Sequence, residues 1–200
     1  TPKPSSAASD VYKRQTSITL NDASSVYNTI LNTSSVSIGP ASSVSVENVT
    51  FLAGTTTITN GGDLYITGST GQGNVTYVGG TVVEQGNTYN QTLTVQNVTS
   101  YSATASAYLN VVIDNSSVAI GGSTITGTAT ASNSATLAIS ADSYPQGGVT
   151  LSTGATATST SSATGDLSGG YPDPTVVAVQ GYAVANTAPS GGQVLAWNGG

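Results

Sequence analysis

The stretch Ser35–Ile38 reads Ser-Val-Ser-Ile, and this alternation of hydroxylated and apolar residues decides the expected fold. The same period of two recurs at Ser43–Val46, Thr92–Val95 and Thr136–Ile139. Successive side chains of an extended strand point to opposite faces, so each stretch places Val, Ile or Leu on one face and mostly Ser or Thr on the other. Val, Ile and Thr also favour the pleated conformation. The pattern predicts many short, half-buried β-strands from Thr16 to about Ser143.

Turn signals and internal similarities divide the strand-rich region. Gly- and Asn-rich turns occur at Gly39–Pro40, Asn60–Asp63, Gly71–Asn74, Gly79–Gly80 and Gly121–Gly122. Ile30–Gly39 is echoed by Val112–Gly121, with five identical positions at an offset of 82 residues. The triplet Ser-Ser-Val also recurs, beginning at Ser24, Ser34 and Ser42. We interpret the ten-residue echo as an internal repeat.

Short strands with loosely repeated spacing favour a β-solenoid, in which each coil stacks its apolar face on the next coil. The chain has only one Trp and one Phe, which is little bulk for the core of a β-sandwich. We therefore expect an all-β, parallel β-helix-like solenoid over residues 16–154. A β-sandwich is the alternative.

The charges of the 200-residue chain are distributed unevenly. All three cations, Lys3, Lys13 and Arg14, precede Gln15, whereas the nine acids are spread along the sequence. The stretch Ser5–Gln15 resembles a translated sequencing adapter, so we expect residues 1–15 to be a disordered artefact. Removing them leaves no cation and eight acids, a net charge of −8.

A chain without cations cannot neutralise nucleic-acid phosphates or bind anionic lipid head groups. No apolar run approaches the roughly 18 residues of a membrane-spanning helix. We therefore expect neither nucleic-acid binding nor membrane insertion.

The residue inventory also restricts catalysis. The absence of His and Cys removes Ser-His and Cys-His nucleophile pairs and the usual zinc sites. Paired carboxylates of the glycosidase type remain possible, and the candidates are Glu47, Asp63, Glu84, Asp114 and Asp142. Because each stands alone in the sequence, we expect each to be structural or solvent-exposed. We predict no enzymatic activity, no catalytic residue, no cofactor and no metal site.

The C-terminal part carries a family resemblance. Residues 155–164 form an Ala/Thr/Ser tract that is typical of a spacer. Gly165–Val176 (Gly-Asp-Leu-Ser-Gly-Gly-Tyr-Pro-Asp-Pro-Thr-Val) and Ala188–Gly199 (Ala-Pro-Ser-Gly-Gly-Gln-Val-Leu-Ala-Trp-Asn-Gly) resemble two linked motifs of phage tail fibres and related virion appendages. The second departs from the family pattern by one extra Gly, at position 191 or 192. The prolines restrain their neighbours to extended geometry, so residues 165–200 are predicted to form a fibre connector.

The resemblance implies a structural component of an extracellular or virion fibre. It implies a homotrimer that attaches to a glycan or protein on a host cell surface. Two alternatives remain open: a bacterial secreted adhesin with a β-helical passenger, and a polysaccharide-degrading tailspike.

Overall fold

The computed structural model describes residues 13–14, 17–21, 23–140, 143, 145–159, 167–168, 175–176, 178–179 and 182–183. The chain divides into two compact units, Thr1–Thr160 and Ser161–Gly200. The extended regular elements within the described ranges are β-strands, and a single residue, Ser143, has 3₁₀ conformation. No helix there is long and apolar enough to cross a bilayer.

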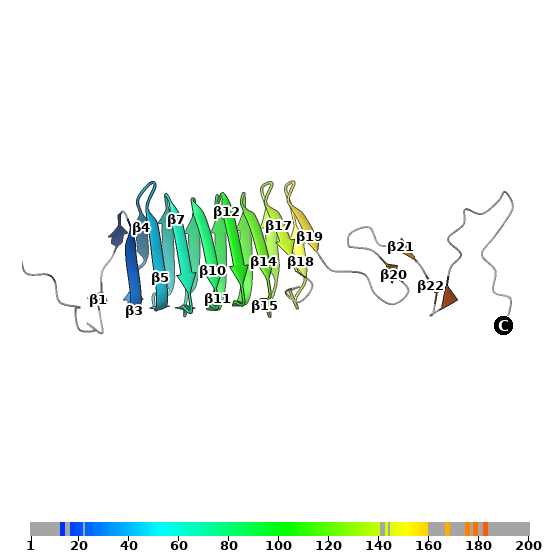
Figure 1. Cartoon of the computed structure of the whole chain (residues 1–200), viewed down its shortest axis with the longest axis horizontal. Helices are drawn as coiled ribbons and strands as arrows, with labels where there is room; N and C mark the ends of the chain where they lie inside the picture. The colour runs from blue at the N-terminus through cyan, green and yellow to red at the C-terminus, as the bar shows by residue number, and fades with distance from the viewer. Residues whose placement is uncertain are drawn as a thin grey trace, which may run out of the picture. The chain divides into compact units, whose positions relative to one another are not determined.

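Nineteen strands of the first unit form one continuous sheet that coils around a single axis (Figure 1). Their bounds are β1 Lys13–Arg14, β2 Ile18–Leu20, β3 Ser24–Asn32, β4 Ser35–Ile38, β5 Ser43–Phe51, β6 Thr55–Asn60, β7 Asp63–Thr67, β8 Thr70–Gly71, β9 Asn74–Val78, β10 Thr81–Gln85, β11 Thr88–Gln96, β12 Ser100–Thr104, β13 Ala107–Asp114, β14 Ser117–Gly121, β15 Thr124–Ile125, β16 Ala129–Ser132, β17 Thr136–Ile139, β18 Val149–Leu151 and β19 Thr156–Ser159.

The strand pairings sort these strands into three stacks. The first stack joins the first halves of β3 and β5 to β7, β10, β12, β14, β17 and β19. The second joins β1 and the second halves of β3 and β5 to β8, the first halves of β11 and β13, and β15. The third joins β2, β4, β6 and β9 to the second halves of β11 and β13, then to β16 and β18.

This architecture is a parallel β-solenoid of about seven turns, which confirms the fold predicted from the alternating pattern. The β-sandwich alternative is wrong, because all the pairings among these nineteen strands are parallel. A sandwich built from short connections would contain antiparallel hairpins. Here each Gly- or Asn-rich turn instead leads the chain from one stack to the next.

The coil period is not the one that the internal echo suggests. Equivalent inward positions of the first stack are separated by 17 to 20 residues, at Val44, Leu64, Val82, Tyr101, Val118 and Leu137. Val36 of the echo lies in the third stack, whereas its counterpart Val118 lies in the first. Reading the echo as a repeat was therefore wrong. Structural equivalence on this stack is carried mainly by the inward and outward alternation, because Val, Leu and Tyr exchange at the same inward position.

Inward side chains of the three stacks form one apolar core, which extends from Val36 to Ile139. Alanines such as Ala129, Ala131 and Ala135 occupy fully buried positions toward its C-terminal end. Small side chains therefore suffice to fill that part of the core.

The boundaries of the solenoid differ slightly from the predicted ones. Thr156–Ser159, the first part of the predicted spacer, forms β19 and pairs with β17, because Ala157 is small enough to pack beside Leu137. Residues 160–166 lie outside the described residues. Of the adapter-like segment the structure describes only β1, which pairs with β3.

Two short antiparallel pairs are described in the second unit. Strand β20 (Leu167–Ser168) pairs with β21 (Thr175–Val176), and β22 (Ala178–Val179) pairs with β23 (Tyr182–Ala183). The first pair falls within the first fibre-like motif. The second fibre-like motif lies outside the described residues.

A ladder of buried polar side chains supports the corner between the first and second stacks. The backbone N–H of one corner residue donates to the side-chain oxygen of the equivalent residue one coil later. The successive donor–acceptor pairs are Val49–Ser69 (3.1 Å), Ser69–Asn87 (2.8 Å), Asn87–Ser106 (3.2 Å), Ser106–Ser123 (3.1 Å) and Ser123–Ser143 (2.8 Å). Buried N–H groups must find partners, and here hydroxyl and amide oxygens provide them where the strands turn.

Replacement of a ladder residue should destabilise the solenoid. Ser123→Ala removes the acceptor of the Ser106 N–H and a donor to the Gly121 carbonyl. An unpaired buried N–H costs about 1–3 kcal/mol, so the free energy of unfolding, measured by urea denaturation, should fall by that amount. The control Ser102→Ala changes an exposed side chain of β12 and should stay within about 0.5 kcal/mol of the parent. Equal midpoints for the two variants would contradict a structural role for the ladder.

Candidate functional site

The four described candidate carboxylates lie in three different environments. Glu47 and Asp63 are exposed on the outer surface of the first stack, and Asp114 is half-buried on the third stack. Glu84 points inward and is 1% exposed. Asp142 lies outside the described residues.

Glycosidase chemistry requires two carboxyl groups about 5 to 9 Å apart. Glu47 is the last residue of the half of β5 that pairs with β7, whereas Asp63 begins β7 and pairs with Ser43, four residues before Glu47. Four residues of strand separate the two acids by about 13 Å. The four described carboxylates therefore do not supply the pair that the tailspike alternative needs.

Glu84 is the centre of a hydrogen-bonded cluster inside the solenoid. The hydroxyls of Tyr77 (2.8 Å) and Tyr89 donate to its Oε1, and those of Tyr101 (2.5 Å) and Tyr108 (3.0 Å) donate to its Oε2. Each carboxylate oxygen thus accepts two phenol protons. We call these five residues the Glu84–tyrosine cluster.

Contacts among the tyrosines complete the cluster. The Tyr77 and Tyr89 hydroxyls are 2.6 Å apart, and those of Tyr101 and Tyr108 are 3.1 Å apart. The rings of Tyr89 and Tyr108, from successive coils of the second stack, lie parallel with centroids 5.5 Å apart. The five side chains come from five successive strands, β9 to β13, so the cluster links consecutive coils through the core.

Small neighbouring residues make room for these rings. A Cβ atom on Gly71 would lie 2.9 Å from the ring of Tyr89. Ala103, which pairs with Glu84 on the adjacent strand β12, is also small and is buried. A larger residue at Gly71 would displace the Tyr89 ring and with it one donor to the carboxylate.

Burial dominates the electrostatics of the cluster. Removal from water raises the pKa of the Glu84 carboxyl above its usual value, although the four phenol hydrogen bonds act in the opposite direction. Burial, reinforced by the nearby Glu84 carboxylate, raises the pKa of all four phenols well above their usual value. The cluster is enclosed in the core, so its chemistry is suited to structural support.

Asp114 has the opposite perturbation. Its carboxylate accepts hydrogen bonds from the side-chain amides of Asn133 (2.5 Å) and Gln96 (3.1 Å) in the adjacent coils. These bonds lower the pKa of Asp114 because they favour its charged form. Asp114 thereby ties three coils together on the outer surface.

Sequence reasoning predicted a structural or exposed role for each carboxylate; Glu47 and Asp63 are exposed, whereas Glu84 and Asp114 are hydrogen-bonded to other side chains. It missed the four tyrosines of the cluster. The signal that the sequence offered was four tyrosines within 24 residues of Glu84, in a chain whose core is otherwise built from Val, Ile, Leu, Ala and one Phe.

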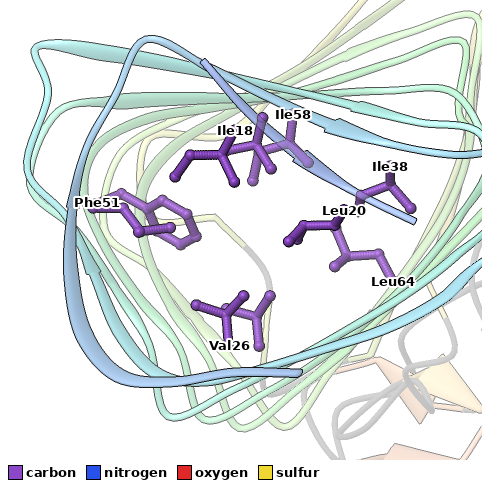
Figure 2. Close-up of a pocket in the computed structure, with 10 residues that line it drawn as sticks. Ile18, Leu20, Val26, Ile38, Phe51, Ile58 and Leu64 are labelled. Carbon is purple, nitrogen blue, oxygen red and sulfur yellow. The ribbon is translucent and has the colours of Figure 1, made fainter. Parts of the chain in front are cut away.

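A separate cavity of about 210 Å³ lies among the first coils of the solenoid. Figure 2 shows Phe51, Ile58 and Leu64, which belong to β5, β6 and β7, pointing into it. All of its lining residues are apolar: Ile18, Leu20, Val26, Leu31, Val36, Ile38, Val46, Phe51, Ile58 and Leu64. Such a lining provides no group for acid–base or nucleophilic chemistry.

Loss of an acceptor oxygen at the centre of the cluster should destabilise the protein. Glu84→Gln replaces an oxygen that accepts two phenol protons with an NH₂ group that accepts none. We expect a loss of about 1–3 kcal/mol in the free energy of unfolding, measured by urea denaturation. Glu47→Gln, on the exposed surface of the same stack, should change stability by no more than about 0.5 kcal/mol. If both variants unfold at the parent midpoint, the cluster does not stabilise the fold.

The cluster also predicts how stability depends on pH. Because the pKa of Glu84 is raised in the folded chain, the unfolded chain loses this proton first, and stability should fall as pH rises above the usual value of 4.5. The raised pKa values of the four tyrosines predict a second fall above pH 10.0, where unfolded phenols ionise and folded ones do not. Urea midpoints measured across this pH range should show both decreases in the parent and only the second in Glu84→Gln. A parent midpoint that rises between pH 10 and pH 11 would contradict this assignment.

Comparison of the chain with protein-family models, with curated proteins and with solved structures gives no significant match in any of the three.

Proposed function

We propose that the chain is a structural component of an extracellular fibre, a phage tail fibre or related virion appendage, which attaches to a host cell surface and performs no catalysis. The observation that carries this proposal is the β-solenoid, a fold compatible with fibrous and adhesive proteins. The resemblance of Gly165–Val176 and Ala188–Gly199 to tail-fibre motifs supports it independently.

The physical properties of the solenoid suit a load-bearing extracellular rod. Hydrogen bonds between coils run along the solenoid axis, and seven turns at about 4.8 Å each span about 34 Å. Stability comes from the apolar core and from buried polar ladders, without any disulfide, because the chain has no Cys. The fold therefore does not depend on the redox state of its surroundings.

A homotrimer is part of the proposal. The ends of a parallel sheet present unpaired backbone groups that favour association with further strands. Leu20, Val26 and Leu31 are only partly buried beside the apolar cavity at the first coils. Assembly into a multimer is one way to remove such surfaces from water.

A bacterial secreted adhesin is the second candidate, because a β-helical passenger would have the same fold. It shares the attachment role and differs in its assembly. This alternative does not require a homotrimer, whereas the fibre is proposed to be trimeric.

The oligomeric state tests the proposal. Light scattering on a chain that begins at Thr16 should give three times the mass of that chain. The full 200-residue chain has a mass of 19.7 kDa. When bacterial cells from a panel are pelleted, the trimer should appear in the pellet of those cells whose surface it binds. A monomer that persists at high protein concentration would contradict the trimeric fibre, and a monomer that binds cells would favour the adhesin.

A further inference from the structure

The outer surface of the first stack is uneven along the solenoid. Its large and charged side chains gather on β3, β5, β7 and β10. We call this group the tyrosine–acid patch, and its members are Tyr27, Glu47, Asp63, Tyr65, Val83 and Gln85. Tyr27 is 62% exposed, Tyr65 45% and Val83 38%.

The C-terminal half of the same surface provides an internal comparison. There the equivalent outward positions hold small residues: Ser100, Ser102, Thr104, Ser117, Ala119 and Gly121. Both halves have the same parallel backbone, so building the stack does not require exposed aromatic rings. An exposed ring leaves apolar area in contact with water, which is unfavourable unless a partner covers it.

The strand register fixes how the patch is arranged. Tyr27 pairs with Glu47, and Glu47 pairs with Thr67. Ser45 pairs with Tyr65, which pairs with Val83. Tyr27 and Tyr65 are therefore two coils and two residues apart, about 12 Å. Ser45 and Glu47, on the strand between them, separate the two rings, so hydrogen-bonding groups lie between two apolar platforms.

The charges of the patch restrict what can bind there. Glu47 and Asp63 are acidic, and residues 17–159 contain no Lys or Arg. A polyanion would be repelled. A second copy of the same surface would bring these carboxylates together. A neutral polysaccharide avoids both penalties, because its hydroxyls donate to the carboxylates and its C–H faces pack on the tyrosine rings.

We infer that the tyrosine–acid patch binds a neutral polysaccharide chain. This inference rests on the proposed attachment function and adds the class of receptor and the residues that contact it. Tyr27 and Tyr65 supply the apolar contacts, and Glu47 accepts hydrogen bonds from sugar hydroxyls between them.

The test uses the full chain on an array of polysaccharides. The neutral members are dextran, mannan, xylan and galactan, and the anionic members are heparin and polysialic acid. Binding to at least one neutral polysaccharide is expected, with no binding to the anionic ones. Tyr65→Ala and Tyr27→Ala should each weaken it by about tenfold or more, as truncation of an aromatic anchor does. Ser102→Ala, on the small-residue half of the surface, should bind like the parent. All three positions point outward, so urea midpoints will show that each variant is folded.

The inference is wrong if no neutral polysaccharide binds, if heparin binds preferentially, or if both tyrosine variants bind like the parent. Loss of self-association in Tyr65→Ala would also overturn it, since that would make the patch a contact between copies. Cell attachment that survives in both tyrosine variants would reject the patch and leave the fibre function intact. Polysaccharide binding without attachment to any cell would reject the attachment function and leave the patch intact.

Discussion

Every part of the solenoid depends on the backbone groups of one coil finding partners on the next coil, at the corners as well as along the strands. Parallel strands satisfy this requirement on the three stacks. At the corner after the first stack, the N–H groups of Ser69, Asn87, Ser106 and Ser123 are satisfied by side-chain oxygens from the following coil. The abundance of Ser and Asn thus has a physical cause, because short polar side chains reach backbone groups that a turn would leave unpaired.

The Glu84–tyrosine cluster shows how the core tolerates a charge. A buried carboxylate is costly unless its hydrogen-bonding capacity is filled, and four phenols fill it. The cluster requires one alignment of five successive strands, since a shift of two residues in β10 would replace Glu84 with Val82 or Gly86. In a chain whose other coils are chemically similar, such a group restricts the register that the strands can adopt.

The fold class could be predicted from the sequence, but the residues that occupy equivalent positions in successive coils could not. Alternation at Ser35–Ile38 and Thr92–Val95 predicts half-buried strands, and low aromatic content favours stacked coils over a sandwich. The coil spacing of 17 to 20 residues could not be read, because equivalent positions such as Leu64, Val82 and Tyr101 share only an inward orientation. The tyrosines of the cluster could not be assigned to Glu84 for the same reason, since their meeting depends on the register. The tyrosine–acid patch could not be predicted either, because it is the strand pairing that brings Tyr27 and Tyr65 onto one stack.

The register of the first stack is the central claim, and cysteine pairs measure it directly because the chain has no Cys of its own. Ser102 pairs with Ala119, which pairs with Ala138. Neighbouring coils place such Cα atoms about 4.8 Å apart, within reach of a disulfide, whereas two coils place them about 9.6 Å apart, beyond it. Mild oxidation should therefore form a disulfide in the double variant Ser102→Cys/Ala119→Cys. It should form none in the double variant Ser102→Cys/Ala138→Cys. Rapid linking of the second pair, or failure of the first, would contradict the stacked-coil structure.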